Sequence, residues 1–145
     1  ESGALGAGAD DAQGHAVVAQ GRHLGVAFQL ADDALDYGGA SETLGKNAGD
    51  DFREAKVTLP LLIAMERTGA AEAAFWARTI DRRDQSEDDF RRARELIVAS
   101  GALTATLDEA GAWADRAKAA LGVLPDTDWR RALASLADFA VSRAA

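Results

Sequence analysis

The sequence predicts an all-α fold arranged as a helical bundle, and three observations carry that prediction. Apolar residues recur at the three- and four-residue spacing of an amphipathic helix along most of the chain. Glycine and proline interrupt this pattern at intervals that suit helices of ordinary length joined by short connections. The alternation of polar and apolar residues that is typical of strands is almost absent.

The first third of the chain is expected to hold two helices. One covers about 10–20, although Gly14 weakens its beginning because glycine is a poor helix former. The other covers about 22–37 and ends at Gly38 and the glycine that follows it.

The middle of the chain is expected to hold two more helices. One covers 59–68, with Pro60 in its first turn and Gly69 directly after its last residue. The other covers 70–79 and carries two adjacent aromatic residues. Both are short, as helices between glycine stops have to be.

The remaining sequence predicts three helices. Ser86 and the three acidic residues after it resemble a capping arrangement for a helix that runs to Ser100 and stops at Gly101. A long alanine-rich helix follows over 103–121. A last amphipathic stripe covers 129–140. The three tryptophans are expected to anchor the core or an interface.

Composition limits the classes of function. The 145 residues suit one domain, and the absence of cysteine excludes disulfides and thiolate metal sites. A net charge of −8 argues against nucleic-acid binding, but not against an anionic diphosphate, because a metal ion inverts the local electrostatics. No apolar run approaches the roughly 20 residues that span a bilayer, so we expect a cytoplasmic protein.

The most informative stretch is 28–36, with the sequence FQLADDALD. At about 100° per residue, its polar side chains share a stripe roughly 100° wide; they are Gln29, Asp32, Asp33 and Asp36. Asp32 and Asp36 are one turn apart and repel each other unless a cation lies between them. The stripe therefore suits a divalent metal ion, and a solvated acidic face is the alternative when this motif is taken alone.

A second cluster, 45–62, begins nine residues after Asp36. Its glycines mark a loop, and it carries Lys46 and Lys56. Clustered carboxylates followed by a lysine-bearing loop suit a metal-bridged phosphate. The carboxylates hold Mg²⁺, the metal binds phosphate oxygens, and the lysines neutralise the remaining charge.

Three stretches in this order resemble the trans-type polyprenyl (isoprenyl) diphosphate synthase family. They are GRHLGVAFQL at 21–30, DDALDY at 32–37, and the run from GK at 45–46 to KVTLPL at 56–61. The second is similar to the family's second aspartate-rich motif, and the third to its GK…GKxTLPL segment. Ala55 stands where the family usually has glycine, which alters the loop but removes no ligand.

The resemblance implies that residues 1–145 are the C-terminal half of a single all-α synthase domain. Family members carry two aspartate-rich motifs on facing helices, and this chain has one. Their chains are longer, and most residues that bind isopentenyl diphosphate lie in the other half. The first eight residues lack a capping signal, so we expect the chain to open within a helix. A natural half-length subunit is the alternative.

The activity that the resemblance implies is elongation of an allylic diphosphate by isopentenyl diphosphate. The expected ligands of the Mg²⁺ cofactor are Asp32, Asp33 and Asp36. Lys46 and Lys56 are expected to bind the allylic diphosphate, and Lys46 is counted with the aspartates as catalytic. Phe28 and Gln29 are expected to line the reacting end. Asp50 and Asp51 lie where family members generally have an aspartate. The resemblance implies that one of the two orients a lysine or reaches a metal through water.

The loop and the alanine-rich tail are similar to long-chain bacterial synthases that make quinone side chains. This favours an octaprenyl to decaprenyl product, with farnesyl and geranylgeranyl products left open. The resemblance also implies a homodimer and a product that associates with membranes. The alternative function is a non-catalytic helical partner subunit of a heteromeric synthase, and a magnesium or calcium buffer is a third, weaker one.

Overall fold

The computed structural model describes residues 2–38, 48–142 and 144, with side chains from residue 11 onward. The chain divides into two compact units. Unit 1 holds Glu1–Gln29, Glu109–Arg143 and the last residue, and unit 2 holds Leu30–Asp108 with Ala144. Every regular element in the described part of the chain is helical, which confirms the all-α prediction. No helix there is long and apolar enough to cross a membrane.

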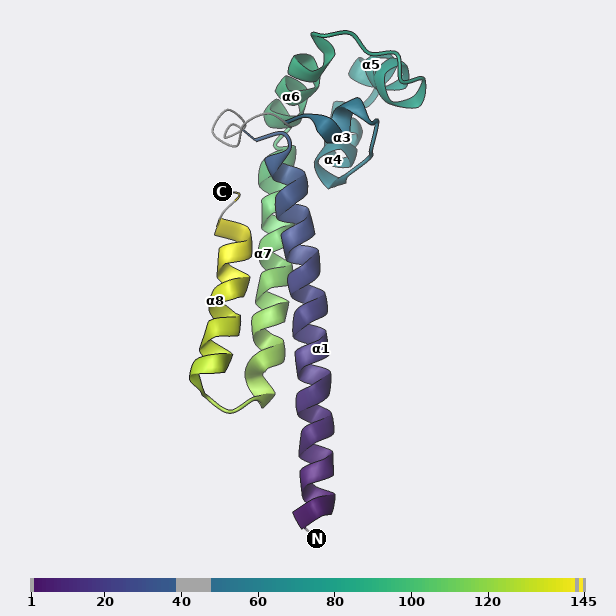
Figure 1. Ribbon diagram of the computed structural model, residues 1–145. Coiled ribbons are helices and arrows are strands. Elements are labelled where there is room, and N and C mark those ends of the chain that lie inside the picture. Colours follow the sequence, from purple (N-terminus) through teal and green to yellow (C-terminus); the bar gives the residue numbers. More distant parts are fainter. Residues whose placement is uncertain (1, 39–47, 143, 145) are drawn as a thin grey trace. The chain divides into compact units, whose positions relative to one another are not determined.

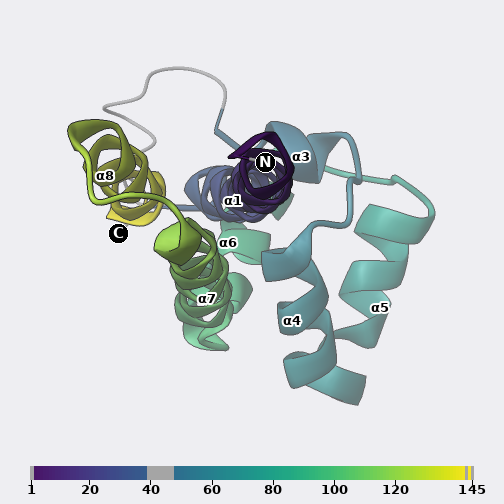
Figure 2. The ribbon, with the colours of Figure 1, turned by 90° about the horizontal axis from the view of Figure 1, so that it is seen from below.

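Unit 1 is built from three long helices, of which the first and second along the chain also contribute residues 30–35 and 102–108 to unit 2 (Figure 1). They are α1 (Ser2–Leu35), α7 (Ala102–Ala120) and α8 (Asp128–Ser142), and the short turn η3 (Leu121–Val123) follows α7. Their shared core consists mainly of alanine: Leu24, Ala27, Ala114, Ala117, Ala137 and Ala140. Small side chains allow close approach of the helix backbones, and Figure 2 shows the three helices viewed along their lengths.

The first helix differs from the prediction, because α1 is one continuous helix and not two. Its glycines at 14, 21 and 25 do not interrupt it, and a side chain at any of them would meet nothing within 4 Å. A buried stripe at helical spacing passes through this region: Ala16, Gln20, Leu24 and Ala27. Packing of that stripe stabilises the helix more than the glycines destabilise it.

Unit 2 consists of short helical pieces. They are α3 (Asp50–Arg53), α4 (Leu59–Thr68), η1 (Gly69–Glu72), α5 (Ala73–Trp76), η2 (Ala77–Asp81) and α6 (Asp89–Ala99), with the beginning of α7. The predicted bounds of α4 are confirmed, with Thr58 before it and Gly69 after it. The stretch predicted as one helix over 70–79 is helical but changes from a 3₁₀ turn to an α turn to a π turn.

Large side chains fill the core of unit 2, in contrast to the alanines of unit 1. The bulkiest are Tyr37, Phe52, Leu61, Trp76 and Ile97. The indole of Trp76 also donates a hydrogen bond to the hydroxyl of Thr68 at 3.0 Å. The expectation that tryptophans anchor the core is therefore confirmed for Trp76. Trp129 in α8 is 54% exposed, so it is not a core residue, and its expected role at an interface stays a prediction.

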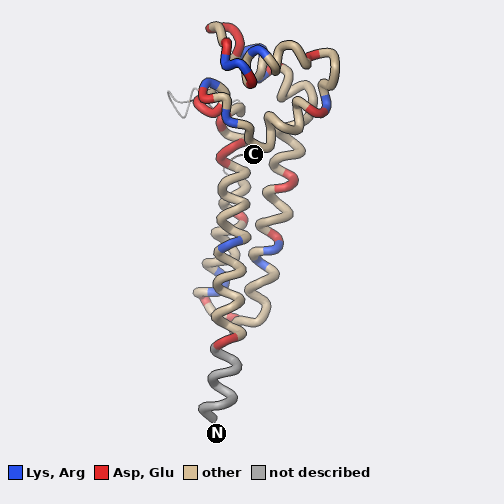
Figure 3. Tube along the Cα trace, turned by 90° about the vertical axis from the view of Figure 1, so that its right-hand side faces the viewer, with Lys and Arg blue, Asp and Glu red and all other residues tan. Residues whose placement is uncertain are grey.

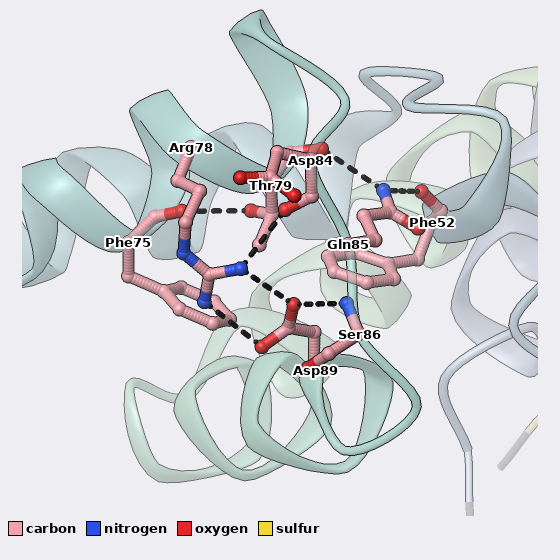
Figure 4. A network of polar contacts seen from close by, with 8 residues as sticks. All are labelled: Phe52, Phe75, Arg78, Thr79, Asp84, Gln85, Ser86 and Asp89. Carbon is pink, nitrogen blue, oxygen red and sulfur yellow. Dashed lines mark hydrogen bonds and ion pairs between the residues drawn. The ribbon is translucent and has the colours of Figure 1, made fainter.

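A network of polar contacts joins η2 to the start of α6 (Figure 4). The guanidinium of Arg78 donates two hydrogen bonds to the carboxylate of Asp89, at 2.8 and 3.0 Å. The same carboxylate accepts the backbone N–H of Ser86 at 2.7 Å, which is one half of a capping box, while α6 begins after Asp88 without a side-chain cap hydrogen bond. The Arg78 hydrogen bonds lower the pKa of Asp89 to about 2. Gln85 donates to the carbonyls of Phe52 and Thr79.

Candidate functional site

The aspartates of the 28–36 motif lie at the end of α1. The backbone N–H of Asp36 donates to the carbonyl of Asp32 at 3.2 Å, so the two residues remain one helical turn apart although α1 ends at Leu35. Asp32 is exposed, whereas Asp33 is buried at 7% exposure. Asp32 and Asp33 therefore differ in exposure, and burial of Asp33 disfavours the alternative of a wholly solvated acidic face.

Asp36 is tied to the following segment by two hydrogen bonds. Its carboxylate Oδ2 accepts the backbone N–H of Asp51 at 3.0 Å. Its carbonyl accepts the N–H of Gly49 at 3.1 Å. Burial raises the pKa of the Asp36 carboxyl, as does the carboxylate of Asp50, while the hydrogen bond from Asp51 opposes this rise. These contacts join the aspartate motif to the segment that leads to Lys56.

Asp51 is part of the same acidic environment. Burial raises the pKa of its carboxyl, and the neighbouring Asp36 raises it further, while Lys56 lowers it. The carboxylate of Asp36 thus lies close enough to disfavour the ionised form of Asp51. This surplus of negative charge fits a divalent cation bound through carboxylate oxygens. Asp50, in contrast, is exposed and forms an ion pair with Arg53 at 3.5 Å.

Lys56 ends the segment that begins at Gly49. Its backbone N–H donates to the carbonyl of Asp51 at 2.8 Å, and its side chain is exposed. Ala55, the residue before it, has φ of 56°, in the left-handed region. A side chain there costs about 1 kcal/mol relative to glycine. The backbone therefore explains physically why glycine suits this position, and Ala55 introduces local strain.

The remaining predicted site residues are Phe28, Gln29 and Lys46. Phe28 is half-buried and packs against the alanine core of unit 1, and Gln29 is exposed. Both precede Asp32 on α1. Lys46 lies outside the described residues. Among the residues that the structure describes, no three His, Cys, Asp or Glu side chains group in a way that could hold a metal ion. The aspartate ligand set stays a prediction.

Comparisons with known proteins agree with the motif. A model of the family described as polyprenyl synthetase matches residues 1–97. Octaprenyl diphosphate synthase of Escherichia coli K12 is 50% identical over 123 residues, which is 85% of this chain and 38% of that protein. The octaprenyl diphosphate synthase of Haemophilus influenzae is 38% identical over 143 residues, 99% of this chain and 43% of that protein.

Solved structures are similar as well. A polyprenyl synthase from Caulobacter crescentus CB15, complexed with calcium and isoprenyl diphosphate, is 67% identical with a TM-score of 0.89, over 99% of this chain and 44% of that one. A decaprenyl diphosphate synthase from Rhodobacter capsulatus is 45% identical with a TM-score of 0.86, over 93% and 42%. The chain spans about two fifths of the length of these relatives. The fold is thus of the isoprenoid synthase type, and the chain belongs to the polyprenyl synthetase family.

Proposed function

We propose that this chain supplies the second aspartate-rich half of a polyprenyl diphosphate synthase active site. In that reaction isopentenyl diphosphate extends an allylic diphosphate. The observation that carries the proposal is the hydrogen bond from Asp51 to Asp36, which fastens the lysine-bearing segment to the aspartate motif. The share of each relative that is matched, 38% of the Escherichia coli protein, supports residues 1–145 as part of a longer all-α domain. The likeness of 32–37 to the second aspartate-rich motif supports the C-terminal half of that domain.

The metal is proposed to be Mg²⁺, held by Asp32, Asp33 and Asp36. Magnesium in proteins is usually bound by one or two carboxylates together with substrate phosphates, which suits a site that is incomplete without its diphosphate. The hydrogen bond between Asp51 and Asp36 keeps these two acidic residues close together, and the Asp36 carboxylate adds to the effect of burial in raising the pKa of Asp51. A cation bound there would relieve this repulsion. When bound, the metal neutralises charge on the departing diphosphate.

The protein side chains then have separate tasks. Lys46 and Lys56 bind the allylic diphosphate and stabilise it as the carbon–oxygen bond breaks. The double bond of isopentenyl diphosphate attacks the allylic carbon, and the condensation product loses a proton. Phe28 and Gln29 line the reacting end, where the amide dipole of Gln29 faces the positive charge. Asp51 holds Asp36 in place through its backbone, and its carboxylate is near enough to Lys56 to orient that side chain.

The proposed product is an octaprenyl to decaprenyl diphosphate for quinone side chains. Support comes from the names of the relatives, octaprenyl diphosphate synthase in Escherichia coli and decaprenyl diphosphate synthase in Rhodobacter capsulatus. We further propose a cytoplasmic homodimer whose long apolar product associates with membranes. Sizing of the purified protein and chain-length analysis of the product test these two points.

The activity is tested with Asp32→Ala in the natural full-length protein. We expect turnover of an allylic diphosphate with isopentenyl diphosphate to fall roughly 10²–10³-fold, because a preorganised electrostatic contact is lost. Asp11→Ala is the matched control, since Asp11 is also an exposed carboxylate of α1. Unchanged turnover with disturbed assembly would instead favour the non-catalytic partner subunit. One relative, from Schizosaccharomyces pombe, is named decaprenyl-diphosphate synthase subunit 1.

A further inference from the structure

Phe90, the second residue of α6, contacts several parts of unit 2 at once. Its ring stacks on Tyr37, the neighbour of Asp36, with 6.1 Å between ring centroids. It lies 6.1 Å from the ring of Phe52 in α3. The guanidinium carbon of Arg53 lies 5.3 Å from its centroid, within the range of a cation–π interaction. One aromatic ring thus joins the end of the aspartate motif to the lysine-bearing segment.

Gly49 makes the closest approach to this ring. A Cβ atom at Gly49 would lie 2.8–2.9 Å from atoms of the Phe90 ring, closer than real Cβ atoms come to other groups. Gly49 also has φ of 89°, in the left-handed region that favours glycine. The backbone at Gly49 therefore rests directly on the face of Phe90, and both the space and the dihedral angle require glycine there.

The segment from Gly49 to Lys56 has little structure that could stand without such support. α3 contains only four residues. Within the segment, Arg53 donates to the carbonyl of Gly49 at 2.9 Å and Lys56 to the carbonyl of Asp51 at 2.8 Å. Its longer-range hydrogen bonds reach Asp36 and Gln85. A single helical turn is unstable in isolation, so its position depends on tertiary contacts. Phe90 supplies these at Gly49, Phe52 and Arg53.

We propose that Phe90 is a positioning residue, a platform that holds the segment 49–56 against Asp36. Resting on the proposed function, this inference assigns Phe90 no contact with substrate. Phe90 acts through Gly49 and Arg53 on the backbone that carries Asp51 and Lys56. Displacing a binding group by even a small distance lowers the efficiency of an enzyme, since catalysis depends on orientation.

The first test measures amide hydrogen exchange in the natural full-length protein. Phe90→Leu removes the ring and keeps an apolar side chain, and Phe90→Tyr keeps the ring. Phe75→Leu is the matched control, because Phe75 is also half-buried and also lies beneath an arginine, with Arg78 5.7 Å from its centroid. We expect exchange at the Arg53 and Lys56 amides to be roughly tenfold faster in Phe90→Leu alone.

Equal exchange at these amides in Phe90→Leu and the wild type would overturn the proposal, as would an equal increase in the Phe75→Leu control. Gly49→Ala acts on the same contact from the other side and serves if Phe90→Leu does not fold. It is expected to accelerate exchange at the same amides.

The second test separates KM from kcat for the allylic diphosphate. Phe90→Leu is expected to raise KM roughly tenfold, with Phe90→Tyr and Phe75→Leu close to the wild type. An unchanged KM and kcat in Phe90→Leu would overturn the link between the platform and the site. A wild-type protein without prenyl-transfer activity would overturn the proposed function instead, and hydrogen exchange would still decide whether Phe90 holds the segment.

Discussion

Units 1 and 2 are both helical, but different interactions stabilise them. The described core of unit 1 is mostly alanine on long, regular helices. The core of unit 2 contains aromatic and large aliphatic side chains between short helical pieces. Close packing of small residues requires matched helix surfaces, whereas irregular backbone needs polar partners for its unpaired groups.

The distribution of charge follows the same division (Figure 3). Arg22 is the single Lys, Arg, Asp or Glu among residues 12–31, which form most of α1. Twelve of the eighteen residues 78–95 are charged, and these include the Arg78–Asp89 pair. The comparison shows that one chain can use side-chain volume to fix one region and hydrogen-bonded charge to fix another.

The largest expected effect on stability comes from removing the ion pair between Arg78 and Asp89 in unit 2. Asp89→Ala should lower the free energy of unfolding by about 3 kcal/mol, because it leaves Arg78 and the N–H of Ser86 without their buried partner. Urea unfolding measures this. The control is Asp84→Ala, an exposed carboxylate. Equal losses in the two variants would contradict the importance of the buried pair.

Acid should weaken the same pair. The pKa of Asp89 is lowered from 3.8 to about 2 in the folded protein. A lowered pKa means that the stabilisation is complete above about pH 4 and is lost as the pH falls toward 2, to a total of about 2 kcal/mol. The difference in stability between the wild type and Asp89→Ala should therefore shrink over that range. A constant difference would show that ionisation of Asp89 does not stabilise the fold.

The stability of unit 1 should depend instead on the volume of the side chains in its alanine core. Ala117→Leu places a larger side chain at a position with 0% exposure in the alanine core and should cost about 2 kcal/mol through overpacking. Ala119→Leu on the same helix is exposed and serves as the control. Thermal unfolding compares the two. Equal stability of the two variants would mean that the helices of unit 1 separate without cost to admit leucine.

The smallest expected effect is the loss of a surface charge pair in unit 1. Lys118 in α7 contacts Asp138 in α8 at 2.7 Å, but both side chains are exposed, by 37% and 65%. Lys118→Ala should therefore cost about 0.5 kcal/mol or less, and the difference should vanish at high salt. A larger loss of stability that does not depend on salt would show that ion pairs also stabilise unit 1.

Helix ends marked by local residues could be predicted from the sequence. Gly69 and Gly101 follow helices where predicted, and Pro60 lies in the first turn of α4. Continuity of α1 could not be predicted, since the stripe that stabilises it packs against residues far away in the sequence. The exposure of Trp129 and the π turn after Trp76 likewise depend on tertiary packing.

The candidate site shows the same limit. Its acidic and basic residue types, and their order along the chain, were visible in the motif. The hydrogen bond from Asp51 to Asp36 uses a backbone N–H, which carries no sequence signal. Phe90 was missed because its contacts join residues up to 53 positions apart, from Tyr37 to the start of α6. The one sequence feature that pointed to such a contact was the glycine at 49, where the structure leaves no room for a side chain beside the Phe90 ring.

The π turn over Ala77–Asp81 closes with the N–H of Arg82 donating to the carbonyl of Ala77, five residues back. Such a turn is equivalent to a helix that has absorbed one extra residue. Deleting one residue from it restores the usual four-residue bond and rotates the residues before the turn by about 100° relative to those after it. The length of this turn, counted in single residues, therefore sets the direction in which the residues before it face relative to the residues after it.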